Sequence, residues 1–289
     1  MCLLDIVFNF FLIFPTRQLD VGGMHVSVPG AGLGVLGAAL GTVSAEIITA
    51  GTMMWYLCAR EKVIAIKGMA GSFRPKREVL RKALKVSAPM TLEHAVICGA
   101  QIAVTVIVAP LGIMAIAANA FAVTAESICY MPGYGIGDAA TTLVGQSYGA
   151  KRFDLARRFG YITVGLGMVT MSVMGVVIYV FAPEVMAMMT PVEAIRDLGV
   201  ESLRIEAFAE PMFAASIVAY GVMIGVGDTI IPAVMNFGSI WLVRLPIAAI
   251  LAPTMGLAGV WLAMCVELCF RGLIFLWRLI SGAWLKKGL

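Results

Sequence analysis

The sequence is dominated by long apolar runs in which charged side chains are almost absent. Hydrophobic residues make up 61% of the 289 positions and charged residues only 13%, whereas about 25% of the residues in soluble domains are charged. A helix needs about 20 apolar residues to cross a bilayer, while a membrane β-barrel shows a weak alternation over about ten residues. The runs match the helical pattern, so we expect an all-α fold, a polytopic membrane helical bundle.

We predict eight transmembrane helices, at about residues 2–16, 31–58, 87–110, 112–147, 157–182, 198–226, 229–252 and 256–280. The first is short for a span, which suggests that the chain begins partway through a larger protein. The fourth would be about 50 Å long if it were wholly helical. It must therefore kink near Pro132–Gly133, tilt, or extend beyond the membrane.

Basic residues gather in three segments: the linker 59–86, the loop 148–158 and the tail that ends in Lys286 and Lys287. Eight alternating spans place all three on one side, which the positive-inside rule makes cytoplasmic. We expect a multi-pass protein of the plasma membrane, a bacterial or archaeal inner membrane, with both termini in the cytoplasm. Apolar residues among the bases of the linker favour an amphipathic segment lying on the membrane lipids. Bases placed between spans do not indicate a nucleic-acid partner.

The segment Tyr130–Arg152 combines an apolar run with many small and polar residues. Every fourth residue is small along one row, which consists of Gly133, Gly137, Thr141, Gly145 and Gly149. Small residues at this spacing allow another helix backbone to approach closely in a membrane. We interpret this row as a packing surface.

Two short segments resemble each other. Leu33–Ala39 reads LGVLGAA, and Met255–Trp261 reads MGLAGVW. Each opens a predicted span that runs in the same direction, which is typical of a parallel internal repeat.

Ionisable residues inside predicted spans are the candidates for function, because a charge in the membrane interior is costly. A carboxyl group in a low-dielectric cavity favours its protonated form, so it can hold a proton and exchange it for a cation. The candidate cation- or substrate-binding residues are Glu93, Gln101, Asn119, Glu126, Tyr130 and Glu210. Glu206 and Arg244 lie at a similar depth in the membrane. They could instead form an ion pair with a structural role. Glu267 is either structural or part of a lobe interior.

We find no enzyme motif in the sequence. There is no cluster of metal ligands, no nucleophile–base pair and no phosphate-binding loop, and the six cysteines show no zinc spacing. We therefore expect no cofactor and no metal site, apart from Na+ at the carboxylates.

The segment MPGYGIGDAATTLVGQSYGAKRFDLARR, residues 131–158, resembles the multidrug and toxic compound extrusion (MATE) family of antiporters. Further matches follow in the family's order, at Ser87–Pro89, Gly221–Thr229, Trp241–Pro246 and Gly256–Trp261. The resemblance implies two six-span lobes, alternating access, and exchange of cationic or amphipathic drugs for Na+ or H+.

By this resemblance the chain holds spans five to twelve of the family. Residues 1–58 would be the last two spans of the N-terminal lobe, 59–86 a cytoplasmic linker, 87–282 the six-span C-terminal lobe and 283–289 a cytoplasmic tail. Some members carry carboxylates in the seventh, eighth and tenth spans, where this chain has Glu93, Glu126 and Glu210. The positions differ, because the family's tenth-span aspartate would align with Phe213. The missing spans, or a second copy of the chain, would be partners.

Two other functions remain open at this stage. A lipid-linked oligosaccharide flippase of the same superfamily would have arginine-rich cavity walls, whereas carboxylates outnumber cations inside these spans. A non-transporting, truncated membrane protein is the other alternative, because a C-terminal lobe with two extra spans does not form a two-lobe cleft by itself.

Overall fold

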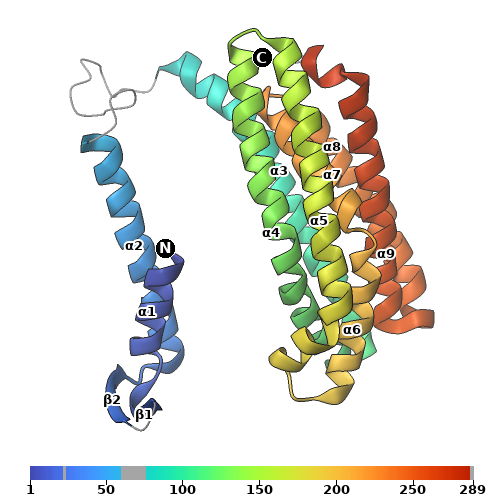
Figure 1. Ribbon diagram of the computed structural model, residues 1–289. Helices are drawn as coiled ribbons and strands as arrows, with labels where there is room; N and C mark the ends of the chain where they lie inside the picture. The colour runs from blue at the N-terminus through green and yellow to red at the C-terminus, as the bar shows by residue number, and fades with distance from the viewer. Residues whose placement is uncertain (22–23, 60–75, 287–289) are drawn as a thin grey trace. The chain divides into compact units, whose positions relative to one another are not determined.

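The computed structural model describes residues 1–21, 24–59 and 76–286. The chain divides into two compact units, Met1–Pro75 and Lys76–Leu289, and helices dominate both (Figure 1). Each unit is described by itself.

The first unit contains two helices separated by a β-hairpin. Helix α1 (Cys2–Leu12) is followed by strands β1 (Pro15–Val21) and β2 (Met24–Ala31), which pair antiparallel, and by helix α2 (Gly34–Ala59). The predicted span 2–16 is thus an 11-residue helix, since the chain already enters the hairpin at Pro15, a residue that lacks the N–H needed to continue a helix. The hairpin was not predicted.

The second unit is a bundle of helices. Its elements are α3 (Arg77–Val108), η1 (Ala109–Leu111), α4 (Ile113–Gly149), α5 (Phe153–Met189), α6 (Glu193–Ala207), α7 (Glu210–Gly225), α8 (Ile230–Gly238), the π-helix η2 (Ser239–Arg244), α9 (Leu245–Ser281) and η3 (Ala283–Lys286). In the described residues of the whole chain, five helices are long and apolar enough to cross a membrane, or six if the pair α6 and α7, bent by 61°, is one span. The polytopic helical bundle is confirmed.

The long segment Ile230–Ser281 folds back on itself at Gly256, whose φ of 62° and ψ of −140° are not helical. A Cβ atom added to Gly259 would lie only 2.6 Å from the Leu251 carbonyl oxygen, so the two halves of α9 lie side by side at the turn. The segment therefore passes along the bundle twice, as the predicted spans 229–252 and 256–280 require.

The same geometry recurs in the first unit. Gly34 has a φ of +54°, and a Cβ on Gly37 would collide with the Leu12 carbonyl oxygen of α1. Gly34 and Gly37 occupy the places in the repeated heptapeptide that Gly256 and Gly259 occupy in α9. A positive φ is readily adopted by glycine alone, so the shared glycines account for the shared backbone conformation and the shared close helix approach, which support the internal repeat. The reversal itself differs, because the β-hairpin turns the chain between α1 and α2.

Helix α4 is continuous through Pro132 over 37 residues, about 55 Å at 1.5 Å per residue. The linker prediction for 59–86 falls largely on residues 60–75, outside the described residues, and its last part is the beginning of α3. Figure 1 shows that α3 begins at the end of the bundle where α4 connects to α5 and where the chain ends. The described parts of the three basic segments, which are the start of α3, the α4–α5 connection and the residues after α9, therefore lie at the same end of this unit.

Helices α4 and α7 pack through glycine. A Cβ on Gly225 would lie 2.6 Å from the Thr141 carbonyl oxygen, and one on Gly145 would lie 2.9 Å from the Gly225 carbonyl oxygen. The Thr141 hydroxyl donates a hydrogen bond across the interface to the Gly221 carbonyl at 2.8 Å. The middle of the small row predicted in α4, Gly137 to Gly145, thus packs on α7, while Gly133 faces Met171 of α5.

This packing predicts that Gly221→Ala destabilises the protein. The new methyl group would meet the backbone of Gly137, whose carbonyl carbon is 3.0 Å away, and the Thr141 hydroxyl at 3.0 Å. Because backbone cannot move aside as a side chain can, we expect the free energy of unfolding to fall by about 1–3 kcal/mol. The measurement is thermal unfolding of the purified chain in detergent.

Gly135→Ala in α4 is the matched control, because no atom lies within 4 Å of its added methyl group. Alanine is the better helix former, so this variant should be as stable as the wild type or slightly more so. Equal stability of both variants would contradict the close approach of α4 and α7.

Candidate functional site

Six charged side chains gather inside the second unit, where four helices and the π-helix come together. Their electrostatic interactions link each of them to others of the set. We call them the buried charge cluster: Glu126 from α4, Glu206 from α6, Glu210 from α7, Arg244 from η2, and Glu267 and Arg271 from α9. Four carboxylates thus face two guanidinium groups.

Glu206 and Glu210 are the least satisfied members of this cluster. Each is only 1% exposed, and within the described part of the chain none of their four carboxyl oxygens has a hydrogen-bond partner. An ionised carboxylate in such a place loses its hydration without compensation, which is very costly. These two groups are therefore suited to hold a proton or to attract a cation.

The break between α6 and α7 positions this pair. The Ala209 N–H bonds to the Glu206 carbonyl at 2.7 Å, and the chain bends there by 61°. Helix α5 makes room for Glu210 at Gly175, where an added Cβ would lie 3.1 Å from the Glu210 Cβ. The predicted span 198–226 is therefore two helices, with one glutamate on each side of the bend.

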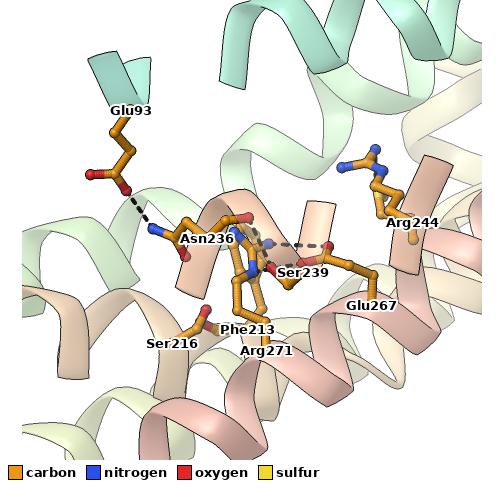
Figure 2. A network of polar contacts seen from close by, with 9 residues as sticks. Glu93, Phe213, Ser216, Asn236, Ser239, Arg244, Glu267 and Arg271 are labelled. Atoms are coloured by element: carbon orange, nitrogen blue, oxygen red, sulfur yellow. Dashed lines mark hydrogen bonds and ion pairs between the residues drawn. The ribbon is translucent and has the colours of Figure 1, made fainter. Parts of the chain in front are cut away.

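The two arginines of the cluster have different partners. The Arg271 Nε lies 3.0 Å from a Glu267 carboxyl oxygen, and its guanidinium lies over the Phe213 ring at 5.5 Å from the centroid. Figure 2 shows Arg271 pointing to Glu267 while Arg244 lies apart. Arg244 instead directs an N–H at the Met264 sulfur.

The direct Glu206–Arg244 ion pair suggested by the sequence is therefore not formed, since neither Glu206 oxygen has a hydrogen-bond partner among the described residues. The two charges interact through space. The reason is the fold-back at Gly256, which brings Met264 of α9 to the Arg244 side chain.

Glu93 belongs to a separate cavity of about 520 Å³. It is 5% exposed and accepts a hydrogen bond from the Tyr220 hydroxyl at 2.7 Å. A second hydrogen bond comes from the Asn236 amide (Figure 2). The cavity wall also contains Asp138 and Arg271. Arg271 is therefore common to this cavity and to the buried charge cluster.

The other sequence candidates lie elsewhere. Tyr130 packs edge-on against Phe213, with ring centroids 5.9 Å apart, but does not line the Glu93 cavity. Asn119 accepts a hydrogen bond from the Trp261 indole at 3.1 Å and shares a third, very small cavity with Gln101 and Arg244. Five of the six candidates thus fall in three places, which are the buried charge cluster, the Glu93 cavity and this small cavity, and Tyr130 lies in none of them. Within the described residues, no three acidic, histidine or cysteine side chains converge as metal ligands.

Comparison with known proteins places this chain in a family. The MatE family model matches residues 89–250, more than half of the chain. The chain belongs to the MatE family.

Two of the relatives illustrate the similarity. A probable multidrug resistance protein NorM from Thermotoga maritima is 28% identical over 248 residues, covering 84% of this chain and 52% of the relative. The multidrug resistance protein MdtK from Yersinia pestis is 24% identical over 241 residues, and the matched region covers 52% of its length. The chain thus spans about half the length of the curated relatives it matches.

Solved MatE structures share the fold. A MATE family transporter of the MOP superfamily in an outward-facing conformation superposes with a TM-score of 0.80 at 21% identity, over 89% of this chain and 58% of the other. At this identity the match establishes the fold alone.

The sequence analysis missed two polar residues of the candidate site. Arg271 and Asn236 each contact a predicted carboxylate, yet neither was among the candidates. Both lie inside apolar runs, where a charged or amide side chain is itself unusual. This signal could have identified them.

The cluster predicts that Arg244→Gln destabilises the MatE chain. The substitution leaves four carboxylates with one guanidinium, so we expect a loss of about 3 kcal/mol near neutral pH, the low end of the cost of an uncompensated buried charge. Acidification should reduce the loss, because protonation of a carboxylate removes the excess charge. Thermal unfolding across a pH series measures both effects.

Arg204→Gln is the matched control. Arg204 is exposed on α6 and contacts Tyr179 rather than the cluster. Its substitution should shift the stability by less than about 0.5 kcal/mol at any pH. An Arg244→Gln variant as stable as this control would argue against the electrostatic role of Arg244.

Proposed function

We propose that this chain acts in a secondary active transporter that exchanges H+ or Na+ for cationic or amphipathic organic molecules by alternating access. The observation that carries the proposal is the pair Glu206 and Glu210, buried at 1% exposure without hydrogen-bond partners. The names of the relatives, which are multidrug resistance proteins, support it.

The chemistry follows from the environment of these two carboxyl groups. Protonated, they are neutral and tolerate burial; deprotonated, they add negative charge to a low-dielectric interior that then favours a cation. A proton requires only one carboxyl group, whereas Na+ requires several oxygen ligands. Glu126 supports the same role, since it interacts with Glu206 and Glu210.

The carboxylate excess supports an antiporter over a lipid-linked oligosaccharide flippase, because an anionic substrate requires a cationic cavity. Four glutamates and two arginines form the cluster, and Glu93 and Asp138 add negative groups to the neighbouring cavity. We assign Glu93 to the substrate side. Tyr130 lies outside the Glu93 cavity and packs against Phe213, which lines it. Gln101 and Asn119 contribute polar lining around Arg244.

We also propose a cellular location and an orientation for the chain. The basic ends of α3 and of the α4–α5 connection would face the cytoplasm of a prokaryotic inner membrane, in keeping with the positive-inside rule. Because the chain spans about half the length of its relatives, a two-lobe cleft would need additional spans or a second copy of this chain.

The transport assay uses the chain reconstituted in liposomes loaded with ethidium, a cationic dye. We expect an imposed H+ or Na+ gradient to drive dye movement against its own gradient, and expect collapse of that gradient by an ionophore to stop it. Liposomes without protein provide the baseline. If correctly inserted protein gives the baseline rate with either ion, the proposed function is wrong for this chain.

Glu206→Gln and Glu210→Gln test the assignment of the coupling site. Each keeps the side-chain size but removes the group that takes up and releases the ion, so ion-driven transport should fall by about tenfold or more, equivalent to at least about 1.4 kcal/mol. Glu201→Gln, on the exposed side of α6, should transport like the wild type. Undiminished coupling in both cluster variants would remove these carboxylates from the mechanism.

A further inference from the structure

Helix α9 carries two cysteines one turn apart, Cys265 and Cys269. Both are free thiols and both are partly buried. Residues four apart in a helix lie on the same face, with their Cβ atoms about 5–6 Å from each other. The two thiols are in hydrogen-bond contact. Helix α9 therefore presents a pair of sulfur atoms on one face.

The spacing of this pair disfavours a disulfide. A disulfide requires Cβ atoms about 3.5–4.5 Å apart, so the helix would have to distort before the S–S bond could close. One atom placed between the two sulfurs removes this difference in length. The pair is therefore suited to a thiophilic atom that binds two thiolates at once.

A cavity of about 580 Å³ between α5, α6 and α9 gives access to the pair. Cys265 lines this cavity beside Ile205 of α6 and Leu262 of α9, and three charged side chains of α6 also belong to its lining. Phe208 and Tyr179 pack edge-on in the wall with ring centroids 5.7 Å apart. They are 71% and 42% exposed, so the cavity opens to the surroundings of the unit.

A proton acceptor lies near the thiols. Glu206 interacts electrostatically with both Cys265 and Cys269, and in the described ranges neither of its carboxyl oxygens has a hydrogen-bond partner. The thiolate is the form of cysteine that binds soft atoms, so each thiol must lose its proton on binding. The Glu206 carboxylate can receive such a proton, which connects the thiol pair to the buried charge cluster.

We propose that Cys265 and Cys269 form a dithiol site for trivalent organic arsenicals. The arsenic atom bridges the two sulfurs, and its organic group occupies the apolar part of the cavity beside Ile205 and Leu262. A three-coordinate arsenic atom that carries an organic group needs only two ligands from the protein. The resulting complex is neutral, and a low-dielectric site tolerates a neutral group far better than an ion.

The reaction at the site is an exchange of ligands on arsenic. With phenylarsine oxide, two As–S bonds form and the bond between arsenic and oxygen breaks. The two thiol protons leave with that oxygen as one molecule of water. Arsenic stays trivalent and the sulfurs are not oxidised, so the step requires no oxidant or reductant.

Occupation of the dithiol site has a consequence for transport. It fixes a bulky apolar group between α6 and α9, next to Glu206. The binding site goes beyond the proposed function, and only this consequence rests on it. Because Glu206 is a proposed coupling residue, we expect the bound arsenical to stop ion-driven transport.

The first experiment measures retention of the arsenical by intact mass spectrometry of the purified full chain. The protein is treated with phenylarsine oxide and then with an excess of mercaptoethanol, a monothiol. A monothiol strips arsenic from single cysteines but competes poorly with two thiols held on one chain, since the second bond forms at a high effective concentration. We expect one phenylarsenic group per chain to remain, and expect the dithiol dimercaptopropanol to remove it.

Single substitutions test whether both thiols are needed. Cys265→Ser and Cys269→Ser each leave one thiol, so retention after the monothiol wash should fall at least about a hundredfold. Cys98→Ser is the matched control, because Cys98 is an exposed free thiol on α3, and it should retain the group like the wild type. A variant with serine at the other four cysteines should also retain one group, and it keeps the test valid if serine in α9 prevents folding.

Two outcomes of this experiment would overturn the inference: a wild-type chain that retains no phenylarsenic group, or a group that survives both single substitutions. The transport assay with ethidium adds a second criterion. Phenylarsine oxide should stop ion-driven dye movement, dimercaptopropanol should restore it, and the Cys265→Ser chain should not respond to the arsenical. Full transport with the arsenical bound would overturn the link to Glu206.

Failure of the proposed function has a different signature from failure of the dithiol site. A chain that retains the arsenical but shows no ion-driven transport would refute the proposed function and leave the dithiol site standing. A chain that transports but retains no arsenical would refute the dithiol site alone.

Discussion

The close approach of α4 and α7 is the constraint on which the interior depends. Glycines on both helices allow their backbones to touch, and the Thr141 hydroxyl bonds across to Gly221. In a membrane such contacts replace the hydrophobic driving force, because lipid tails are as apolar as the helix surface. The same two helices carry Glu126 and Glu210 of the cluster, and Asp138 and Tyr220 of the cavity. Wider spacing would separate the groups that meet in both places.

Arg271 connects the two polar regions. It lines the cavity that contains Glu93, pairs with Glu267 and interacts with Glu126. Two unit charges about 8 Å apart in a medium of effective dielectric about 20 interact by about 2 kcal/mol. A change of protonation at one carboxyl group can therefore alter the affinity of the neighbouring cavity for a cation through the field alone. Coupling between an ion and an organic cation does not require that both occupy the same atoms.

The sequence predicts the features that depend on local pattern. Apolar run length locates α2 to α5 within a few residues at most ends, and the glycine row of α4 identifies a packing surface. The sequence does not predict the β-hairpin after Leu12, because the apolar run before Pro15 does not show which residues the first strand of the hairpin would pair with. Partner choice is likewise not local. Arg244 meets Met264 rather than Glu206 because of the chain reversal at Gly256, and Arg271 becomes a site residue only when α9 packs beside α7.

The bend between α6 and α7 is the strongest indication that the buried charge cluster does not serve to stabilise the fold. Glu206 and Glu210 would be better replaced by apolar residues if packing were the only demand, since a buried carboxyl group without donors stabilises nothing. A straight helix would also place the two residues one turn apart on one face, while the 61° bend sets them on separate segments that approach α4, α5 and α9. Residues that reduce stability persist where a function requires them. A carboxyl group whose charge changes when it binds or releases an ion fits that requirement. Each change of charge has its largest electrostatic effect in a buried site, where the dielectric is lowest.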